Sequence, residues 1–137
     1  MSGLRVFALL LGTALASAGC GGDRYIVVGT AKAPSVSGYL VVEGAGAGAE
    51  VTVHLEQLHP ATALDPNLHA YVVWFVPASG AAQRAGSLKY RPDERVGELK
   101  AQTPFGKFVV KVTAEANDKP AAPSDFLVAS QELTLED

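Results

Sequence analysis

Hydrophobic and polar residues alternate along much of the chain, with a period of two residues in the clearest segments. In residues 50–56, EVTVHLE, every second side chain is apolar, and residues 107–115, KFVVKVTAE, follow a similar pattern. This period is typical of a β-strand with one buried face and one solvent-exposed face. Residues 71–76, YVVWFV, are apolar at every position, which predicts a central strand covered on both sides. No segment shows a convincing 3.6-residue helical period.

The eight prolines separate these apolar segments, and none lies in the middle of one. Because proline lacks the N–H that a central strand donates, this placement suits a β-protein. We therefore expect an all-β fold, a single antiparallel immunoglobulin-like β-sandwich of about seven to eight strands after an N-terminal signal peptide. The expected strands are Tyr25–Thr30, Val36–Glu43, Glu50–Gln57, Ala70–Pro77, Gly86–Arg91, Val96–Ala101, Gly106–Glu115 and Phe126–Leu135.

Trp74 is the only tryptophan and lies in the strand that is apolar on both faces. A large aromatic side chain in such a strand usually belongs to the core. We expect its indole between the two sheets, packed by Val53, Leu88 and Val110.

The N-terminus has the parts of a secretory signal peptide. Arg5 supplies a positive charge, and the 13 residues from Val6 to Ala18 are uncharged, largely apolar and end in small side chains. That run is shorter than the roughly 20 residues that a membrane-spanning helix needs. A signal peptide is therefore the better interpretation.

The signal peptide ends in Ser17-Ala18-Gly19-Cys20, which resembles the lipobox of bacterial lipoproteins. The resemblance implies that Cys20 carries acyl chains and becomes the first residue after cleavage, giving residues 1–19 as signal peptide, 20–24 as lipidated tether and 25–137 as the sandwich domain. Acyl chains on Cys20 would anchor the protein in the membrane. In this family, Gly21 in place of aspartate favours the outer membrane. Cys20 is the only cysteine, so no internal disulfide is expected.

Charge narrows the range of partners. Without Arg5 the chain has 10 Lys and Arg against 14 Asp and Glu, a net charge near −4. This balance, with no basic cluster, argues against a nucleic-acid partner. We expect instead a membrane partner, reached through the acyl chains on Cys20, and another envelope protein.

Candidate chemistry is sparse. Two imidazoles and a carboxylate can form a zinc or copper site, and a set of this kind is offered by His54, Glu56, His59 and His69. No H-x-H, H-x₃-H or C-x-x-C spacing supports it, so no metal and no cofactor is predicted. No serine lies in a G-x-S-x-G turn, and no enzyme activity is expected.

The second half of the chain holds a Y-x-x-W-x-V strand, an x-x-G-x-L strand, a glycine-containing turn and an F-x-V-x-V-T-x-E strand, in that order. From His69 to about Ser130 this succession resembles the extracytoplasmic domain of anti-sigma-K-type factors. The matching positions are mostly packing residues, so the resemblance implies a fold and no activity, and sigma-factor binding is not carried over. The matching positions are Tyr71, Trp74, Val76, Gly86, Leu88, Gly97, Phe108, Val110, Val112, Thr113 and Glu115.

These observations predict a lipid-anchored envelope protein that acts as a non-enzymatic interaction or accessory module of a secretion, motility or stress-sensing complex. The loops Leu58–Leu68 and Asn117–Asp125 are the expected contact regions, because binding surfaces tend to lie on loops held by a rigid scaffold. The alternative is a metal-binding or metal-delivering lipoprotein that uses the four-residue set above.

Overall fold

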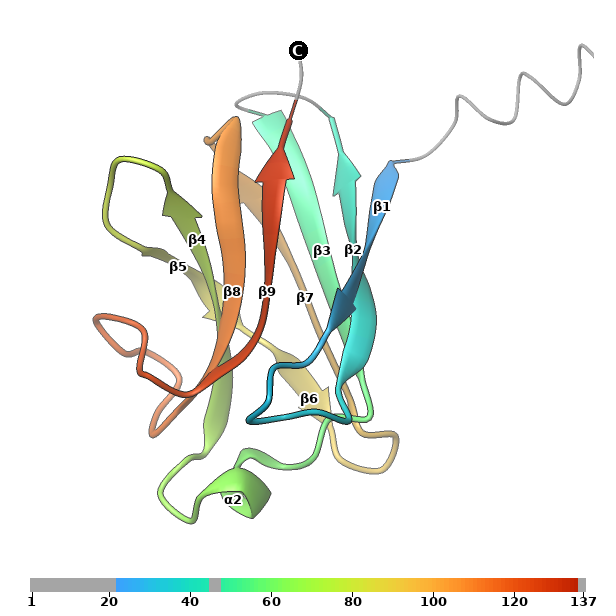
Figure 1. Cartoon of the computed structure of the whole chain (residues 1–137), viewed down its shortest axis with the longest axis vertical. Coiled ribbons are helices and arrows are strands. Elements are labelled where there is room, and N and C mark those ends of the chain that lie inside the picture. Colours follow the sequence, from blue (N-terminus) through green and yellow to red (C-terminus); the bar gives the residue numbers. More distant parts are fainter. Residues whose placement is uncertain (1–21, 45–47, 136–137) are drawn as a thin grey trace, which may run out of the picture.

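The computed structural model describes residues 22–44 and 48–135. Within them the chain forms nine strands and one short helix (Figure 1). The strands make two antiparallel sheets packed face to face, as in a β-sandwich. The all-β prediction is therefore confirmed. The predicted signal peptide and Cys20 lie outside the described residues.

The first sheet has the order β1-β2-β3-β7-β6 and the second has the order β5-β4-β8-β9. Every registered strand pair is antiparallel. The elements are β1 (Asp23–Val28), β2 (Ser37–Glu43), β3 (Ala49–Glu56), α2 (Ala61–Leu64), β4 (Ala70–Pro77), β5 (Gln83–Ser87), β6 (Lys89–Arg91), β7 (Val96–Thr103), β8 (Lys107–Glu115) and β9 (Leu127–Thr134).

The order β2-β3-β7-β6 against β5-β4-β8-β9 is that of strands A-B-E-D and C′-C-F-G in an immunoglobulin domain. One strand falls outside this scheme. β1 is added beyond β2, at the edge of the five-stranded sheet, and pairs with it from Asp23 opposite Val42 to Val28 opposite Ser37.

The core lies between the sheets and is built by the alternation seen in the sequence. Val51, Val53 and Leu55 of β3 face the second sheet, and Phe108 and Val110 of β8 face the first, all nearly inaccessible to solvent. Phe75 and Phe108 meet edge to face, with ring centroids 5.2 Å apart. This packing accounts for the strict alternation in residues 50–56.

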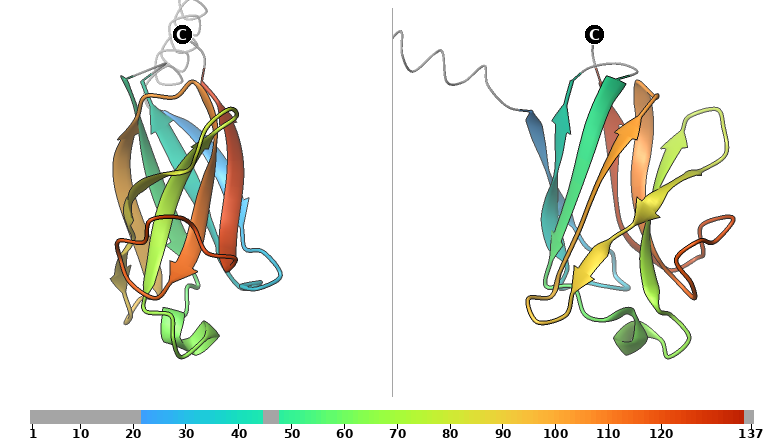
Figure 2. Two further views of the ribbon diagram at one scale, coloured as in Figure 1. Left: turned by 90° about the vertical axis from the view of Figure 1, so that its left-hand side faces the viewer. Right: turned by 180° about the vertical axis from the view of Figure 1, so that it is seen from behind.

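The expected strand Gly86–Arg91 is two strands. β5 belongs to the second sheet and β6 to the first, and the chain passes from one to the other at Leu88 (Figure 2, right). The Leu88 N–H donates to the carbonyl of Tyr71, and the side chain enters the core. Gly97 permits this crossing, because a Cβ there would lie 3.0 Å from both Leu58 and Leu88 side-chain atoms.

Two smaller expectations also need correction. β1 begins at Asp23, so residues 23 and 24 belong to the sheet rather than to a tether ending at Arg24. The short helix α2 was not expected, since four residues are too few to show a helical period.

Trp74 is buried, with 1% of its surface exposed, but it does not lie between the sheets. Tyr71, Val73 and Phe75 occupy the inner side of β4, and alternation therefore turns Val72 and Trp74 outward. The predicted packing against Val53, Leu88 and Val110 is wrong for this reason. The indole is buried on the outer side of the four-stranded sheet.

A connection between β8 and β9 covers that outer side. We call residues 116–126 the strap and the outer side of the four-stranded sheet the covered face. The strap crosses β4 (Figure 2, left), and β5 holds it: Arg84 donates to the carbonyl of Pro120 at 2.6 Å and Ser87 to that of Asp118 at 3.0 Å.

A buried polar network lies under the strap. The Trp74 indole N–H donates to Thr113 Oγ1 at 2.8 Å, and the Thr113 hydroxyl donates to Glu115 Oε2. The same carboxylate oxygen accepts the backbone N–H of Ser124 at 2.8 Å. Thr113 and Glu115 are therefore buried, although their positions in the alternating pattern predict a solvent-exposed face.

Candidate functional site

The outer side of the five-stranded sheet, here the open face, has no connection across it comparable to the strap among the described residues. Cross-strand register aligns its side chains in rows. One row runs Ile26, Tyr39, His54, Glu98 and Lys89, from β1 to β6. The next row, toward the end of the domain where β1 begins, is Arg24, Val41, Thr52 and Lys100.

Side chains of the two rows form a continuous series of contacts that begins at Arg24 of the second row. The Arg24 guanidinium lies 4.1 Å from the centroid of the Tyr39 ring, a favourable cation–π distance. The Tyr39 ring in turn stacks on the His54 imidazole, with centroids 4.7 Å apart and planes 17° from parallel.

Carboxylates hold both nitrogens of the imidazole. His54 Nδ1 lies 2.6 Å from Glu98 Oε2, and Nε2 lies 3.0 Å from Glu56 Oε2. Only the protonated ring can donate both bonds. Arg91 continues the chain of charges, with Nη1 3.3 Å from Glu98 Oε1 and Nε 2.7 Å from Glu94 Oε1.

This network changes the electrostatics of Glu98. The hydrogen bond with His54 is the largest influence and holds the pKa of the Glu98 carboxyl below its ordinary value, with a further contribution from Arg91 and some opposition from burial. Glu98 is therefore ionised and already paired on both oxygens. Its negative charge is offset before any ligand arrives.

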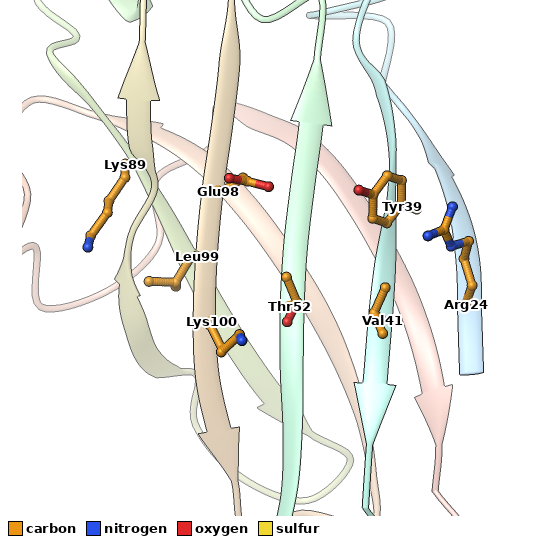
Figure 3. Close-up of a pocket in the computed structure, with 8 residues that line it drawn as sticks. All are labelled: Arg24, Tyr39, Val41, Thr52, Lys89, Glu98, Leu99 and Lys100. Atoms are coloured by element: carbon orange, nitrogen blue, oxygen red, sulfur yellow. The ribbon is translucent and has the colours of Figure 1, made fainter. Parts of the chain in front are cut away.

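Beside this network the open face is hollowed (Figure 3). The hollow has a volume of about 520 Å³. Arg24 borders it on one side, and Lys89 and Lys100 border it on the other. It is lined by Arg24, Tyr39, Val41, Thr52, Lys89, Glu98, Leu99 and Lys100.

The hollow is positively charged in a chain that is acidic as a whole. Within the described residues no ion pair involves Arg24 or Lys89, and Lys100 reaches Glu50 only at 4.0 Å, between exposed groups. Three cations with hydrogen-bonding capacity to spare, next to the Thr52 hydroxyl and the Tyr39 ring, suit a carboxylate-bearing partner.

The structure does not bring together the four residues of the metal-binding alternative. His54 and Glu56 share the open face as expected, but both nitrogens of His54 are occupied by carboxylates. His59 lies in the β3–β4 connection with Nδ1 3.3 Å from Arg95 Nη1, and His69 is an exposed residue directly before β4. No group of three or more His, Cys, Asp or Glu in residues 22–44 and 48–135 could hold a metal ion.

The loop Leu58–Leu68 is held by tyrosines at its start. The Tyr90 hydroxyl donates to the carbonyl of Leu58 at 2.6 Å, and the Tyr71 hydroxyl donates to that of His59. Burial first, and then neighbouring Tyr90, raises the pKa of Tyr71 far above its ordinary value, so this phenol stays a donor. Leu58 itself is buried.

The other expected contact loop, Asn117–Asp125, forms most of the strap and is fastened to the covered face. Both loops therefore have packing roles at positions where a contact surface was expected. The open face, by contrast, carries the charged hollow described above.

Sequence reasoning did not single out Arg24, Tyr39, Lys89 or Lys100. Each occupies an ordinary polar or aromatic position of its own strand, and these four residues come from four strands. Only the cross-strand register makes them neighbours, and the register is not visible in a single sequence.

Comparison with protein-family models, with curated proteins and with solved structures gave no match for this chain. The function is therefore argued from the sequence and from the geometry of the open face. In the described residues, no helix has the length and apolar character required to cross a membrane.

Proposed function

We propose that the chain is a lipid-anchored outer-membrane protein whose immunoglobulin-like domain binds another envelope protein through the open face. The single observation that carries the proposal is the positively charged hollow between Arg24, Lys89 and Lys100. The partner contributes an acidic segment to this hollow. The role is that of a non-enzymatic accessory module in an envelope complex.

The proposed anchor supports this use of the open face. Only Gly21 and Gly22 separate Cys20 from Asp23, the first residue of β1, and a chain reaches at most about 3.6 Å for each of these three residue-to-residue steps. The start of β1 therefore lies within about 11 Å of an acylated Cys20. β9 ends at the same end of the sandwich (Figure 1), so this end faces the membrane and α2 faces away.

The row that contains Arg24 and Lys100 is consequently close to the membrane. A partner bound in the hollow is itself a membrane-associated protein or one held at the membrane surface. Binding at this position matches an accessory role in a larger envelope assembly.

The anchor is tested by labelling with radioactive palmitate and by density-gradient fractionation of the host. The wild-type chain takes up label and bands with outer-membrane markers, whereas Cys20→Ser takes up none and leaves the membrane fraction. Absence of label in the wild type, or banding with the inner membrane, contradicts this part of the proposal.

The interaction is tested by chemical crosslinking in the native host, followed by affinity purification and mass spectrometry. The charge-reversed variant Lys89→Glu/Lys100→Glu is compared with Lys107→Glu/Lys119→Glu, which changes the same charge at exposed positions outside the hollow. We expect one protein to be recovered with wild type and control and at least tenfold less with the hollow variant. Equal recovery with both variants rules out the hollow.

A further inference from the structure

The edge of the five-stranded sheet formed by β1 differs from the other sheet edges. β1 pairs with β2 on one side, and on its other side the described residues place no strand in register with Asp23–Val28. Only at its end does the chain join β9, through the bridge between Gly29 and Ala129 and the bond from the Thr30 N–H to the carbonyl of Val128. β1 is the outermost strand beside β9 (Figure 1).

Beyond Arg24, the outward side chains of this edge are apolar. Ile26 and Val28 are 71% and 68% exposed and are the large hydrophobic side chains that the described surface leaves exposed. They project on the open face, in register with Tyr39 and Ser37. Exposed apolar residues on an unpaired strand form a template for another strand.

The other edges carry the features that discourage pairing. β6 has three residues and includes Lys89 and Arg91. β5 is interrupted by a bulge opposite Val73 and Trp74, and β9 exposes Ser130 and Glu132. Short length, charge and bulges protect an edge, whereas residues 25–28, YIVV, contain none of these.

We propose that β1 accepts an extended segment of the partner protein, which adds a strand to the five-stranded sheet. The segment runs antiparallel to β1, as every other registered pair in the domain does. Its chemistry follows from the residues it meets: apolar side chains opposite Val28 and Ile26, then an acidic one opposite Arg24. Backbone hydrogen bonds supply affinity and the alternate side chains supply specificity.

A second copy of this chain is the other candidate occupant, and the proposed anchor disfavours it. Antiparallel pairing of two β1 strands places their Asp23 residues about 17 Å apart along the strands, at about 3.3 Å per residue. With the end of one domain at the membrane as proposed, the Asp23 of the other copy would lie farther from the membrane than the about 11 Å that the chain to its own Cys20 can span. A partner segment has no such restriction. This step rests on the proposed function.

The test uses the full chain purified in detergent and a fluorescein-labelled peptide of sequence TVTVTDT, whose binding is followed by fluorescence anisotropy. A peptide with the same side chains but methylated amides on the edge that faces β1 is the matched control. We expect the unmodified peptide to bind at least tenfold more tightly than the methylated one. Binding also slows amide exchange in residues 23–28.

Two variants give the side-chain register. Ile26→Lys weakens peptide binding at least tenfold and leaves the unfolding midpoint unchanged, because the side chain is exposed. Arg24→Glu weakens TVTVTDT and strengthens the charge-swapped peptide TVTVTKT. Strand addition by a partner segment is overturned if the methylated peptide binds equally well or if neither peptide binds. It is also overturned if the chain forms a dimer that Ile26→Lys dissociates. None of these outcomes changes the result expected from the crosslinking experiment with the charge-reversed variant of the hollow. The two proposals can therefore fail independently of each other.

Discussion

The outer faces of the two sheets start from similar sequence patterns and end in opposite environments. On the open face, polar side chains form a chain of contacts from Arg24 through His54 to Glu94 and stay partly accessible to solvent. On the covered face, the strap closes over Trp74, Thr113 and Glu115 and removes them from solvent. A period of two tells which side of a strand a residue occupies, but not whether another segment covers that side.

This difference separates a face with a structural role from the face that we propose for binding. On the covered face, Trp74, Thr113, Glu115 and the Ser124 N–H satisfy one another, so burial costs little and stability depends on the whole network. On the open face, the cations around the hollow are left with hydrogen-bonding capacity, which is what a site for a partner requires.

Replacing the tryptophan should give the largest loss of stability. Trp74→Ala removes a fully buried indole and its bond to Thr113, and truncations of this kind cost about 3–5 kcal/mol. That is a large part of the roughly 5–15 kcal/mol that stabilises a typical domain. Urea unfolding measures the change, with Trp74→Phe as the variant that keeps most of the buried ring. A loss below about 1 kcal/mol for Trp74→Ala would show that the strap does not bury the indole.

The buried carboxylate should have the next largest effect. Glu115→Ala leaves the Thr113 hydroxyl and the Ser124 N–H without their acceptor, and an unsatisfied buried group costs about 1–3 kcal/mol. Glu132→Ala, an exposed position on β9, is the matched control and should change stability by about 0.5 kcal/mol or less. Faster amide exchange at Ser124 in Glu115→Ala would locate the damage in the strap. Equal effects of the two substitutions would contradict the network.

On the open face, replacing Glu98 should have a small effect on stability that depends on pH. Because its pKa is lowered on folding, Glu98 stabilises the protein above its ordinary pKa, about 4.5, and this contribution is lost as the pH falls through the lower folded value. The side chain is 40% exposed, so solvent limits the contribution to about 0.5 kcal/mol or less. Unfolding curves of wild type and Glu98→Gln should differ at pH 7 and converge as the pH falls through the lowered pKa of Glu98. A difference that grows toward low pH would reverse the sign.

Metal addition should have no measurable effect on the open face. With both His54 nitrogens held by Glu98 and Glu56, we expect zinc or copper to bind no more tightly than the micromolar range in isothermal titration calorimetry. His54→Ala serves as the control and should give the same titration. A nanomolar site lost in that variant would restore the metal-binding alternative.

Much of the fold could be predicted because the strands follow from local patterns of apolar and polar residues. The range Ala70–Pro77 agrees with β4 at both ends, and the alternation in residues 50–56 identified the buried side of β3 correctly. The position of Trp74 could not be predicted in this way, because a strand that is apolar on both faces does not show which face meets the other sheet. The strap is held by Arg84 and Ser87 of β5, which lie 36 and 31 residues from their partners in the strap.

The site was predicted less well than the fold. His54 and Glu56 were expected on one strand face, but Glu98, which is 44 residues away from His54, completes the network through strand pairing. The break at Leu88 likewise depends on its backbone hydrogen bond to Tyr71 of the neighbouring strand β4. Both features come from tertiary contacts that leave no local pattern.

The central claim is that the open face, and not the covered face, meets the partner. Photocrosslinking in the living host tests it most directly: a photoreactive amino acid replaces Lys100 on the open face or Lys107 on β8, with Cys20 intact in both. We expect an adduct with a second protein from position 100 and none from position 107. Adducts of equal yield from both positions, or an adduct from position 107 alone, would contradict it.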